Sequence, residues 1–357
     1  MNQSPFKYDF KDIKLDNDLT GVFSFQQTTA ECNVILSRDE WIEKTRSPLN
    51  LKLKKYQYDC SVNFHDSYDN KKPTIIITIN NNSDLLKFTV SNFESNGVLE
   101  ICNVVIVDDR STEDLKSIVL DKKLNYVRVD TDMGFNFSML NNIGANIVDS
   151  MGGKQIIIWN SDLWCPNPDV LPEILRLHNE DNSKFSGTKL LYPTKEETLN
   201  DQDYTYNIAN HFPQIENWRG KVQFGGDYWI FQQKLGFLGP MHFGRFFNPE
   251  DPRVNCNRGI SFMTGAFHLF ELEHFKDIGG YNPSLVKAFQ DVDICLRSIE
   301  AGVYVSYYGK DLYLYHDESY SFYSGDQNKK HDKRHDVDHM IYYRMWGQKT
   351  PSLTIGR

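Results

Sequence analysis

Long apolar runs are missing from the sequence, and no stretch approaches the roughly 18 to 20 residues that a membrane-spanning helix needs. Cysteine is also scarce. The six cysteines among 357 residues lie far apart without a single CxxC pair, which excludes a zinc ribbon and a dense disulfide framework, so we expect reduced packing residues. The opening residues, MNQSPFKYDFKDIK, lack the apolar core of a signal peptide. These absences indicate a soluble cytoplasmic protein, with peripheral attachment to the inner face of a membrane left open.

Positive charge is in deficit. Thirty-nine Lys and Arg residues stand against 48 Asp and Glu residues, a formal net charge of −9, and no long basic run is present. A surface that neutralises the phosphates of a nucleic acid is therefore disfavoured, and an anionic ligand has to be held by a local site. Hydrophobic residues make up 40% of the chain, which is enough for a sizeable core. We expect a folded globular protein.

Apolar β-branched runs alternate with helical patterns in the first half of the chain. The runs that predict strands are 73–79, 98–109, 124–130 and 154–159, and the patterns that predict helices are 84–95, 111–120 and 135–151. Strands that are apolar throughout and alternate with helices predict an α/β fold, with a mostly parallel sheet covered by helices on both faces. Ligands of such folds bind at the carboxyl ends of the strands.

The pattern also suggests domain boundaries. Residues 1–70 form an N-terminal extension without a legible periodicity, and residues 71–320 form the main domain. Within that domain, residues 192–258 are aromatic and rich in Gly and Asn, which indicates an insertion or loop layer. Residues 321–357 form a charged C-terminal tail.

Two acids follow the second predicted strand. Asp108 and Asp109 lie at the expected binding edge, where a carboxylate can accept hydrogen bonds from a nucleobase or a ribose. Capping of the following helix explains them equally well. A phospho-acceptor receiver domain is disfavoured, because its acid pair follows the first strand and not the second.

A second polar group follows the fourth predicted strand. Asn160 and Asp162 are two residues apart, and side chains at this spacing point the same way in extended backbone, so both can face one hard cation and the phosphates that it bridges. An Asx turn that ends the strand is the alternative. His316 follows an alternating aromatic strand and is either structural or a further ligand.

A third group lies at the start of a predicted helix. Asp291 is at or near its first turn, where free N–H groups and the helix dipole stabilise a carboxylate. It is therefore either a structural cap or an ionised general base. Asp293 points in another direction and is either structural or orients an acceptor.

Seven segments resemble, in their order and spacing, the GT-A glycosyltransferases of family 2, particularly a bacterial subset. They are FNFSMLNNIGA (135–145), NSD (160–162), KLLYP (189–193), MTGAFHLF (263–270), IGGYN (278–282), FQDVDICLR (289–297) and LYHDES (314–319). The resemblance covers residues 72–320. It implies a GT-A (Rossmann-like) α/β fold and an inverting transfer of a hexose-type sugar from a nucleotide-diphosphate sugar. The implied acceptor is a hydroxyl of a glycan, polysaccharide or glycoconjugate precursor.

The resemblance also implies donor contacts. Asp109 would contact the base of the nucleotide, with Thr78 and Asn80 lining the same pocket. Asn136 and Asn142, from the FNFS segment, would lie beside the nucleoside. A UDP-sugar is the expected donor.

Metal, catalytic and acceptor residues are implied in the same way. Asp162 would bind a divalent cation, Mn²⁺ or Mg²⁺, with Asn160 as a weaker or water-mediated ligand that also contacts the donor. His316 matches a histidine that joins the metal in some relatives, and Asp291 matches the catalytic base. The residues implied at the acceptor site are Thr264, Gly265, Asp293 and Trp164.

Two alternatives from other classes remain. A protein of the same fold that binds a glycan or nucleotide-sugar without turnover would share these motifs. A nucleotidyltransferase would need a Gly-rich phosphate loop and a nearby basic residue, and TINNNSDLL has neither. The leaving diphosphate also needs a positive charge, for which Lys221, Arg245 and Arg258 are candidates. No pattern indicates an oligomeric state.

Overall fold

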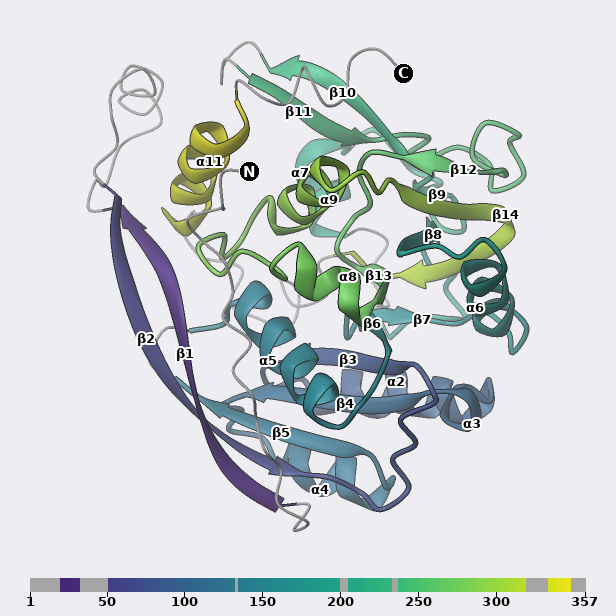
Figure 1. The fold of residues 1–357 in the computed structure, drawn as a ribbon. Helices are drawn as coiled ribbons and strands as arrows, with labels where there is room; N and C mark the ends of the chain where they lie inside the picture. Colours follow the sequence, from purple (N-terminus) through teal and green to yellow (C-terminus); the bar gives the residue numbers. More distant parts are fainter. Residues whose placement is uncertain are drawn as a thin grey trace.

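The structure is a computed structural model that describes residues 20–32, 51–131, 134–199, 205–232, 237–318 and 333–347. Over these residues, twelve strands form one sheet (Figure 1). In order across the sheet they are β1 (Thr20–Cys32), β2 (Leu51–Asn63), β5 (Asn125–Asp130), β4 (Asn103–Asp109), β3 (Thr74–Ile79), β6 (Gln155–Trp159), β13 (Phe267–Glu271), β8 (Phe185–Leu191), β14 (Val305–His316) and β12 (Asn257–Ile260), with β7 (Leu163–Trp164) on β14 and β9 (Val222–Phe224) on β8. Helices cover both faces, so the predicted α/β class is confirmed.

The strands β5, β4, β3 and β6 form a parallel core. Every side chain of β3 and β4 is buried, as expected for strands that are covered on both faces. The strand predicted over 98–109 is shorter than expected, because Val98–Ile101 forms the helix α3 and β4 begins at Asn103. Gly97, with φ of +66°, turns the chain just before α3. A short apolar run by itself does not distinguish a buried strand from a buried helical turn.

Helices hold this core from two sides. The helix α5 (Phe137–Ser150) crosses one face of the parallel strands, whereas α2 (Ser83–Ser95) and α4 (Leu115–Asp121) lie behind the other face (Figure 1). A Cβ atom on Gly144 would lie 2.6 Å from the side chain of Ile76. The glycine therefore permits the close approach of α5 to β3.

The second half of the sheet is mixed. The strand β13 runs antiparallel to both β6 and β8, and β14 runs parallel to β8. The helices of this half are α6 (Val170–Glu180), which packs on β14, α8 (Leu272–Asp277), which follows β13, and α9 (Gln290–Glu300), which precedes β14.

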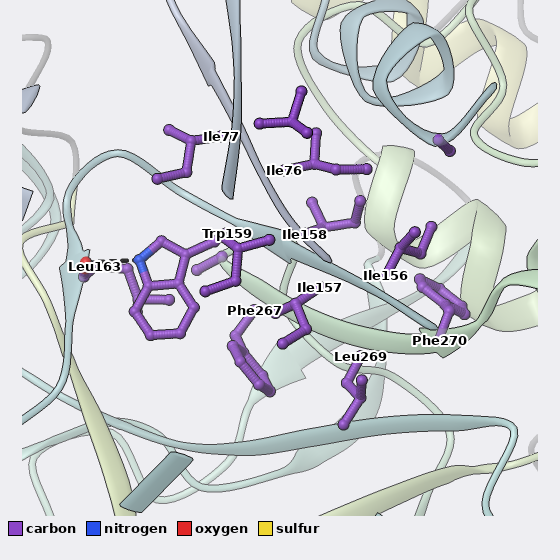
Figure 2. Packing of buried hydrophobic residues seen from close by; sticks show 14 of the residues in the cluster. Ile76, Ile77, Ile156, Ile157, Ile158, Trp159, Leu163, Phe267, Leu269 and Phe270 are labelled. Carbon is purple, nitrogen blue, oxygen red and sulfur yellow. Dashed lines mark hydrogen bonds between the residues drawn. The ribbon is translucent and has the colours of Figure 1, made fainter. Parts of the chain in front are cut away.

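The largest hydrophobic core of the described residues extends through both halves of the sheet, including the junction between them. Figure 2 shows Ile156, Ile157 and Ile158 of β6 beside Phe267, Leu269 and Phe270 of β13, and all six are fully buried. The indole N–H of Trp159 donates to the carbonyl oxygen of Leu163 at 2.8 Å, which fixes the turn that follows β6. This packing positions the Asn160–Asp162 loop.

The extension, the insertion and the tail contribute elements that the sequence pattern did not show. The strands β1 and β2 form a long antiparallel hairpin, and β2 pairs with β5 at the edge of the parallel core. The insertion contains α7 (Tyr206–His211), β9 and a separate hairpin of β10 (Asp227–Gln232) and β11 (Phe237–His242). In the tail, α11 (Lys333–Trp346) is a helix. None of the described helices combines the length and the apolarity of a membrane span.

Candidate active site

The carboxyl ends of β3 and β4 bring three of the predicted donor residues together. The side-chain amide of Asn80 donates to the carbonyl oxygen of Asp109 at 2.5 Å, and Thr78 precedes it on β3. The side chain of Asp109 is buried, with 1% of its surface exposed. Arg110 Nε lies 3.2 Å from its Oδ1. Burial raises the pKa of Asp109, and the charge of Arg110 opposes that rise only in part. The predicted Thr78, Asn80 and Asp109 thus share one edge of the sheet.

The neighbouring acid Asp108 has a structural role. Its Oδ1 accepts hydrogen bonds from the backbone N–H and the hydroxyl of Ser111, at 2.9 and 2.5 Å. Its Oδ2 accepts from the hydroxyl of Tyr126 at 2.5 Å and lies 3.5 Å from Arg128 Nη1. These bonds hold the turn after β4, whereas the partner of Asp109 is the half-exposed side chain of Arg110.

Asp162 and His316 are brought together by the pairing of β7 with β14. In that pairing His316 lies opposite Leu163, and the N–H of Asp317 donates to the carbonyl oxygen of Asp162 at 3.0 Å. His316 Nε2 lies 3.2 Å from Asp162 Oδ1, and the two residues are only 7% and 9% exposed. The contact lacks the geometry of a hydrogen bond, so within the described residues Nε2 is buried without a hydrogen-bond partner.

The other ring nitrogen of His316 fixes the tautomer. His316 Nδ1 lies 2.7 Å from Oε1 of the buried Gln223 on β9, and Gln223 Nε2 lies 3.5 Å from the carbonyl oxygen of His316. The amide nitrogen therefore faces a carbonyl and the amide oxygen faces the ring, so Nδ1 carries the proton. Nε2 is therefore the ring nitrogen that faces the carboxylate of Asp162, and a proton or a cation between the two atoms would balance the negative charge.

This pair of atoms fits a divalent cation. Neighbouring ligands of an octahedral ion with bonds of about 2.1 Å are about 3.0 Å apart, close to the observed 3.2 Å. A carboxylate oxygen and a neutral imidazole nitrogen suit Mn²⁺, and they would leave positions for water or phosphate oxygens. Burial lowers the pKa of His316, but the charges of Asp162, Glu318 and Asp317 together outweigh burial, so the pKa is raised. The pocket therefore favours a positive charge.

A third protein ligand is not provided by an ionisable side chain. Across the described ranges, no group of three His, Cys, Asp or Glu residues is placed to hold a metal ion. Asn160, the other predicted ligand, is half-buried at the end of β6, and its backbone N–H donates to the carbonyl oxygen of Ala266 at 3.0 Å. Asn160 is only two residues from Asp162, so its side-chain oxygen is the candidate for a weaker ligand of the cation.

Asp291 lies in the first turn of α9 against the TGA segment. The N–H of Gly265 donates to Asp291 Oδ2 at 3.0 Å, and the N–H of Val292 lies 2.9 Å from Oδ1. A Cβ atom on Gly265 would lie 3.3 Å from Asp291 Cβ, so the glycine allows this approach. Burial raises the pKa of Asp291 although the backbone N–H groups oppose it. Thr264 and Gly265, both predicted at the acceptor site, are half-buried beside this carboxylate.

The cation pair and the carboxylate of Asp291 are linked through one short segment. Asn160, two residues before Asp162, is bonded to Ala266, and the preceding residue, Gly265, is bonded to Asp291. The register of β6 with β13, in which Trp159 lies opposite Phe267, fixes the first of these contacts. The structure thus brings Asn160, Asp162 and Asp291 to adjacent parts of the same sheet edge.

Asn136 and Asn142 have structural roles. Asn136 caps α5, since its Oδ1 accepts from the N–H of Met139 at 3.0 Å, and its Nδ2 donates to the carbonyl oxygen of Pro283 at 2.9 Å. Asn142 exchanges two bonds of 2.8 Å with the backbone N–H and C=O of Tyr281. Both side chains are buried. Their amides tie α5 to the segment before α9, in contrast to the nucleoside contacts that the resemblance implied.

Asp293 and Trp164 are also engaged in the interior. Asp293 Oδ2 accepts from Arg297 at 2.8 and 2.9 Å, and its Oδ1 accepts from the indole N–H of Trp346 at 2.8 Å. Trp164 is buried and packs edge to face on Phe88, with 5.0 Å between ring centroids. Both side chains are buried, and Asp293 has the structural role that was its alternative.

Comparisons with known proteins give matches only among solved structures, because no protein-family model and no curated protein sequence matches the chain. A structure of GalNAc-T7 with UDP, GalNAc and Mn²⁺ is 13% identical with a TM-score of 0.48, and it covers 70% of this chain and 44% of that one. TarS residues 1–349 of S. aureus are 15% identical with a TM-score of 0.41, over 80% and 75%. The mannosyltransferase PcManGT from Pyrobaculum calidifontis, with GDP-Man and Mn²⁺, is 13% identical with a TM-score of 0.42, over 88% and 77%. This chain thus spans less than half the length of the GalNAc-T7 chain.

The three basic candidates for the diphosphate all have partners. Arg245 forms a partly buried ion pair with Glu318, at 2.9 and 3.2 Å. Burial would raise the pKa of Glu318, but the positive charge nearby, chiefly that of Arg245, lowers it to about 2. Arg258 Nη2 donates to the carbonyl oxygen of Gly225 at 2.7 Å, and Lys221 Nζ donates to the side chain of Asn248. The charge of Arg245 is therefore already matched within the protein.

Sequence reasoning missed Gln223. The residue lies in the insertion, where no periodicity marks a strand, and its contact with His316 spans 93 positions of the chain. A glutamine has no distinctive sequence signal of its own. Only the pairing of β9 with β8 places it next to the end of β14.

Proposed function

We propose that the protein is an inverting glycosyltransferase of the GT-A type that transfers a sugar from a nucleotide-diphosphate sugar to an acceptor hydroxyl. The observation that carries the proposal is the connected arrangement at one sheet edge. There the Asp162–His316 pair is linked through Asn160 and Ala266 to the carboxylate of Asp291. A cation site beside an activated carboxylate is what a metal-assisted transfer requires.

The donor is positioned by the first half of the sheet. Asp109, with Thr78 and Asn80 beside it, contacts the base and ribose of the nucleotide at the carboxyl ends of β3 and β4. The diphosphate then extends along that edge toward Asp162. A UDP-sugar is the favoured donor, and the acceptor is a glycan or glycoconjugate hydroxyl.

A divalent cation bound at Asp162 and His316, with Asn160 as a weaker ligand, would neutralise charge on the leaving diphosphate as a Lewis acid. The protein residues orient the ligands and shield the site. Gln223 holds the His316 ring with Nε2 toward the pocket, and the buried surroundings exclude competing water.

Asp291 serves as the general base. As the acceptor oxygen attacks the anomeric carbon, its proton passes to the carboxylate of Asp291, and the bond from that carbon to the diphosphate oxygen breaks with its electrons. The attack comes from the face opposite the leaving group, so the configuration inverts without a glycosyl-enzyme intermediate. The raised pKa of Asp291 makes it a stronger proton acceptor than an exposed aspartate.

The decisive experiment compares unmodified protein with Asp291→Asn. UDP-, GDP- and dTDP-sugars are first screened with Mn²⁺ by thermal shift, since a ligand selective for the native state raises the melting temperature. Transfer or donor hydrolysis is then measured with the selected donor. Loss of the base should lower kcat by about 10² to 10⁴-fold and leave donor affinity unchanged.

Two other outcomes would point elsewhere. Full turnover by Asp291→Asn would refute its role as base. Donor binding without any turnover by the unmodified protein would favour a nucleotide-sugar-binding protein on the same fold. Asp162→Ala is the matched variant for the cation site, and it should weaken donor binding only when Mn²⁺ is present.

A further inference from the structure

The turn that carries Asp291 is poorly stabilised by its own residues. The helix α9 begins after Phe289, which has φ of +63° and gives the helix no side-chain cap. A bulky residue in the left-handed region is unfavourable, so neighbouring structure has to maintain the turn. Asp291 follows just two residues later. The position of its carboxylate therefore depends on what holds Phe289.

The helix α11 supplies the contact. The ring of Phe289 stacks on Tyr342, with 4.3 Å between centroids and 16° between planes, and meets His339 edge on at 4.7 Å. Leu285, in the same turn, packs with Ile341 in a small hydrophobic cluster. The apolar side of α11 thus covers the segment that leads into α9.

A carboxylate of α11 also binds the backbone of this segment. The buried Asp338 accepts hydrogen bonds from three consecutive N–H groups, those of Val286 at 3.0 Å, Lys287 at 2.5 Å and Ala288 at 2.8 Å. Consecutive N–H groups that converge on one anion form a nest, and such charge-assisted bonds are about twice as strong as neutral ones. Asp338 therefore fixes the backbone immediately before Phe289.

The far end of α11 holds the other side of the turn. The indole N–H of Trp346 donates to Asp293 Oδ1 at 2.8 Å, while Arg297 occupies Oδ2. Asp293 lies two residues beyond Asp291. The middle and the C-terminal end of α11 therefore bind the chain on both sides of Asp291, through Asp338 before it and Trp346 after it.

We propose that α11 positions the carboxylate of Asp291, with Asp338 and Trp346 as its positioning residues. The inference rests on the proposed function for its catalytic consequence. Loss of the contacts of either Asp338 or Trp346 should let the turn at 286–293 shift relative to Gly265. The donor contacts at Asp109 lie on the other half of the sheet, so they stay in place.

The test uses Asp338→Asn and Trp346→Phe in the full chain, with Arg344→Gln as a matched control on an exposed position of the same helix. Asp338→Asn keeps the shape of the side chain and removes its charge. Trp346→Phe keeps an aromatic ring and removes the N–H donor. Folding of each variant is checked by near-ultraviolet circular dichroism.

Hydrogen–deuterium exchange gives a readout that does not depend on activity. Each variant should raise amide exchange in peptides that cover 263–265 and 286–293 by about 10-fold, with no change in peptides that cover 103–109. The Arg344→Gln control should match the unmodified protein. Exchange that changes only within α11, or equally over the whole chain, would overturn the proposal.

Kinetics gives the second readout. Per mole of donor-binding sites, kcat for transfer should fall by about 10 to 100-fold in Asp338→Asn and Trp346→Phe, with the donor KM unchanged. An unchanged kcat in both variants would overturn the positioning role. If no donor supports turnover by the unmodified protein, the proposed function fails, whereas the exchange measurement still decides whether α11 fixes the turn.

Discussion

Gln223 gives the sharpest test of the cation site, because it can be changed without touching a proposed ligand. In Gln223→Met, His316 Nδ1 loses the oxygen that lies 2.7 Å away. Both residues are buried, so water does not readily replace that oxygen. The neutral imidazole is then more stable with its proton on Nε2, which lies 3.2 Å from the Asp162 carboxylate. The lone pair that a cation needs is lost in that tautomer.

The expected size of the effect follows from the role of such supporting bonds. Removing the partner that orients a ligating histidine weakens metal affinity by about 10 to 100-fold, or about 1.4 to 2.8 kcal/mol. Methionine has nearly the volume of glutamine, so the packing around β9 is kept. The variant should therefore bind Mn²⁺ more weakly without a comparable loss in the free energy of unfolding.

Isothermal titration with Mn²⁺, with and without UDP, measures the change directly. Gln155→Met serves as the matched control, since Gln155 lies at the opposite end of β6 and its amide is bonded to Asn179 and Glu271. Equal Mn²⁺ affinity in Gln223→Met and the unmodified protein, alongside a clear loss in His316→Ala, would falsify the tautomer argument. A loss of equal size in Gln155→Met would show that the effect is not local.

Two further predictions concern single residues. Transfer should decline as the pH is lowered through the raised pKa of Asp291, because the base must be ionised. At saturating Mn²⁺ the acid limb of kcat/KM should therefore lie at a higher pH than the pKa of an exposed aspartate. An acid limb at or below the pKa of an exposed aspartate contradicts this. Asn142→Ala removes both bonds to Tyr281 and leaves two buried backbone groups unpaired, so urea unfolding should show a loss of about 2 to 4 kcal/mol. Donor affinity should stay constant, and a fall in donor affinity with stability preserved would restore the nucleoside role that the sequence implied.

Several parts of the site were predictable because they depend on local patterns. The apolar runs that became β3, β4, β5 and β6 predict a parallel core. Polar residues at the ends of such strands share one edge, which is how Asp109 and Asp162 could be placed at that edge before the structure was known. Asn80 was added by the family resemblance.

Other parts were not predictable from residue types. The motif residues Asn136, Asn142 and Asp293 have the chemistry of ligands, yet their partners lie within the protein. The bonds from Asn136 and Asn142 reach about 140 positions along the chain, and that from Asp293 to Trp346 spans 53. A buried polar side chain that is fully bonded and one that awaits a ligand look the same in sequence.

The sequence by itself determined the layered α/β architecture and the edge at which ligands would bind, because strand periodicity and strand polarity are local properties of the chain. Only the tertiary structure decided which polar residues face that edge. It placed Gln223 behind His316 and closed α11 over the turn that carries Asp291. Both contacts join segments that are remote in sequence, and they form only once the core has fixed the distances between them.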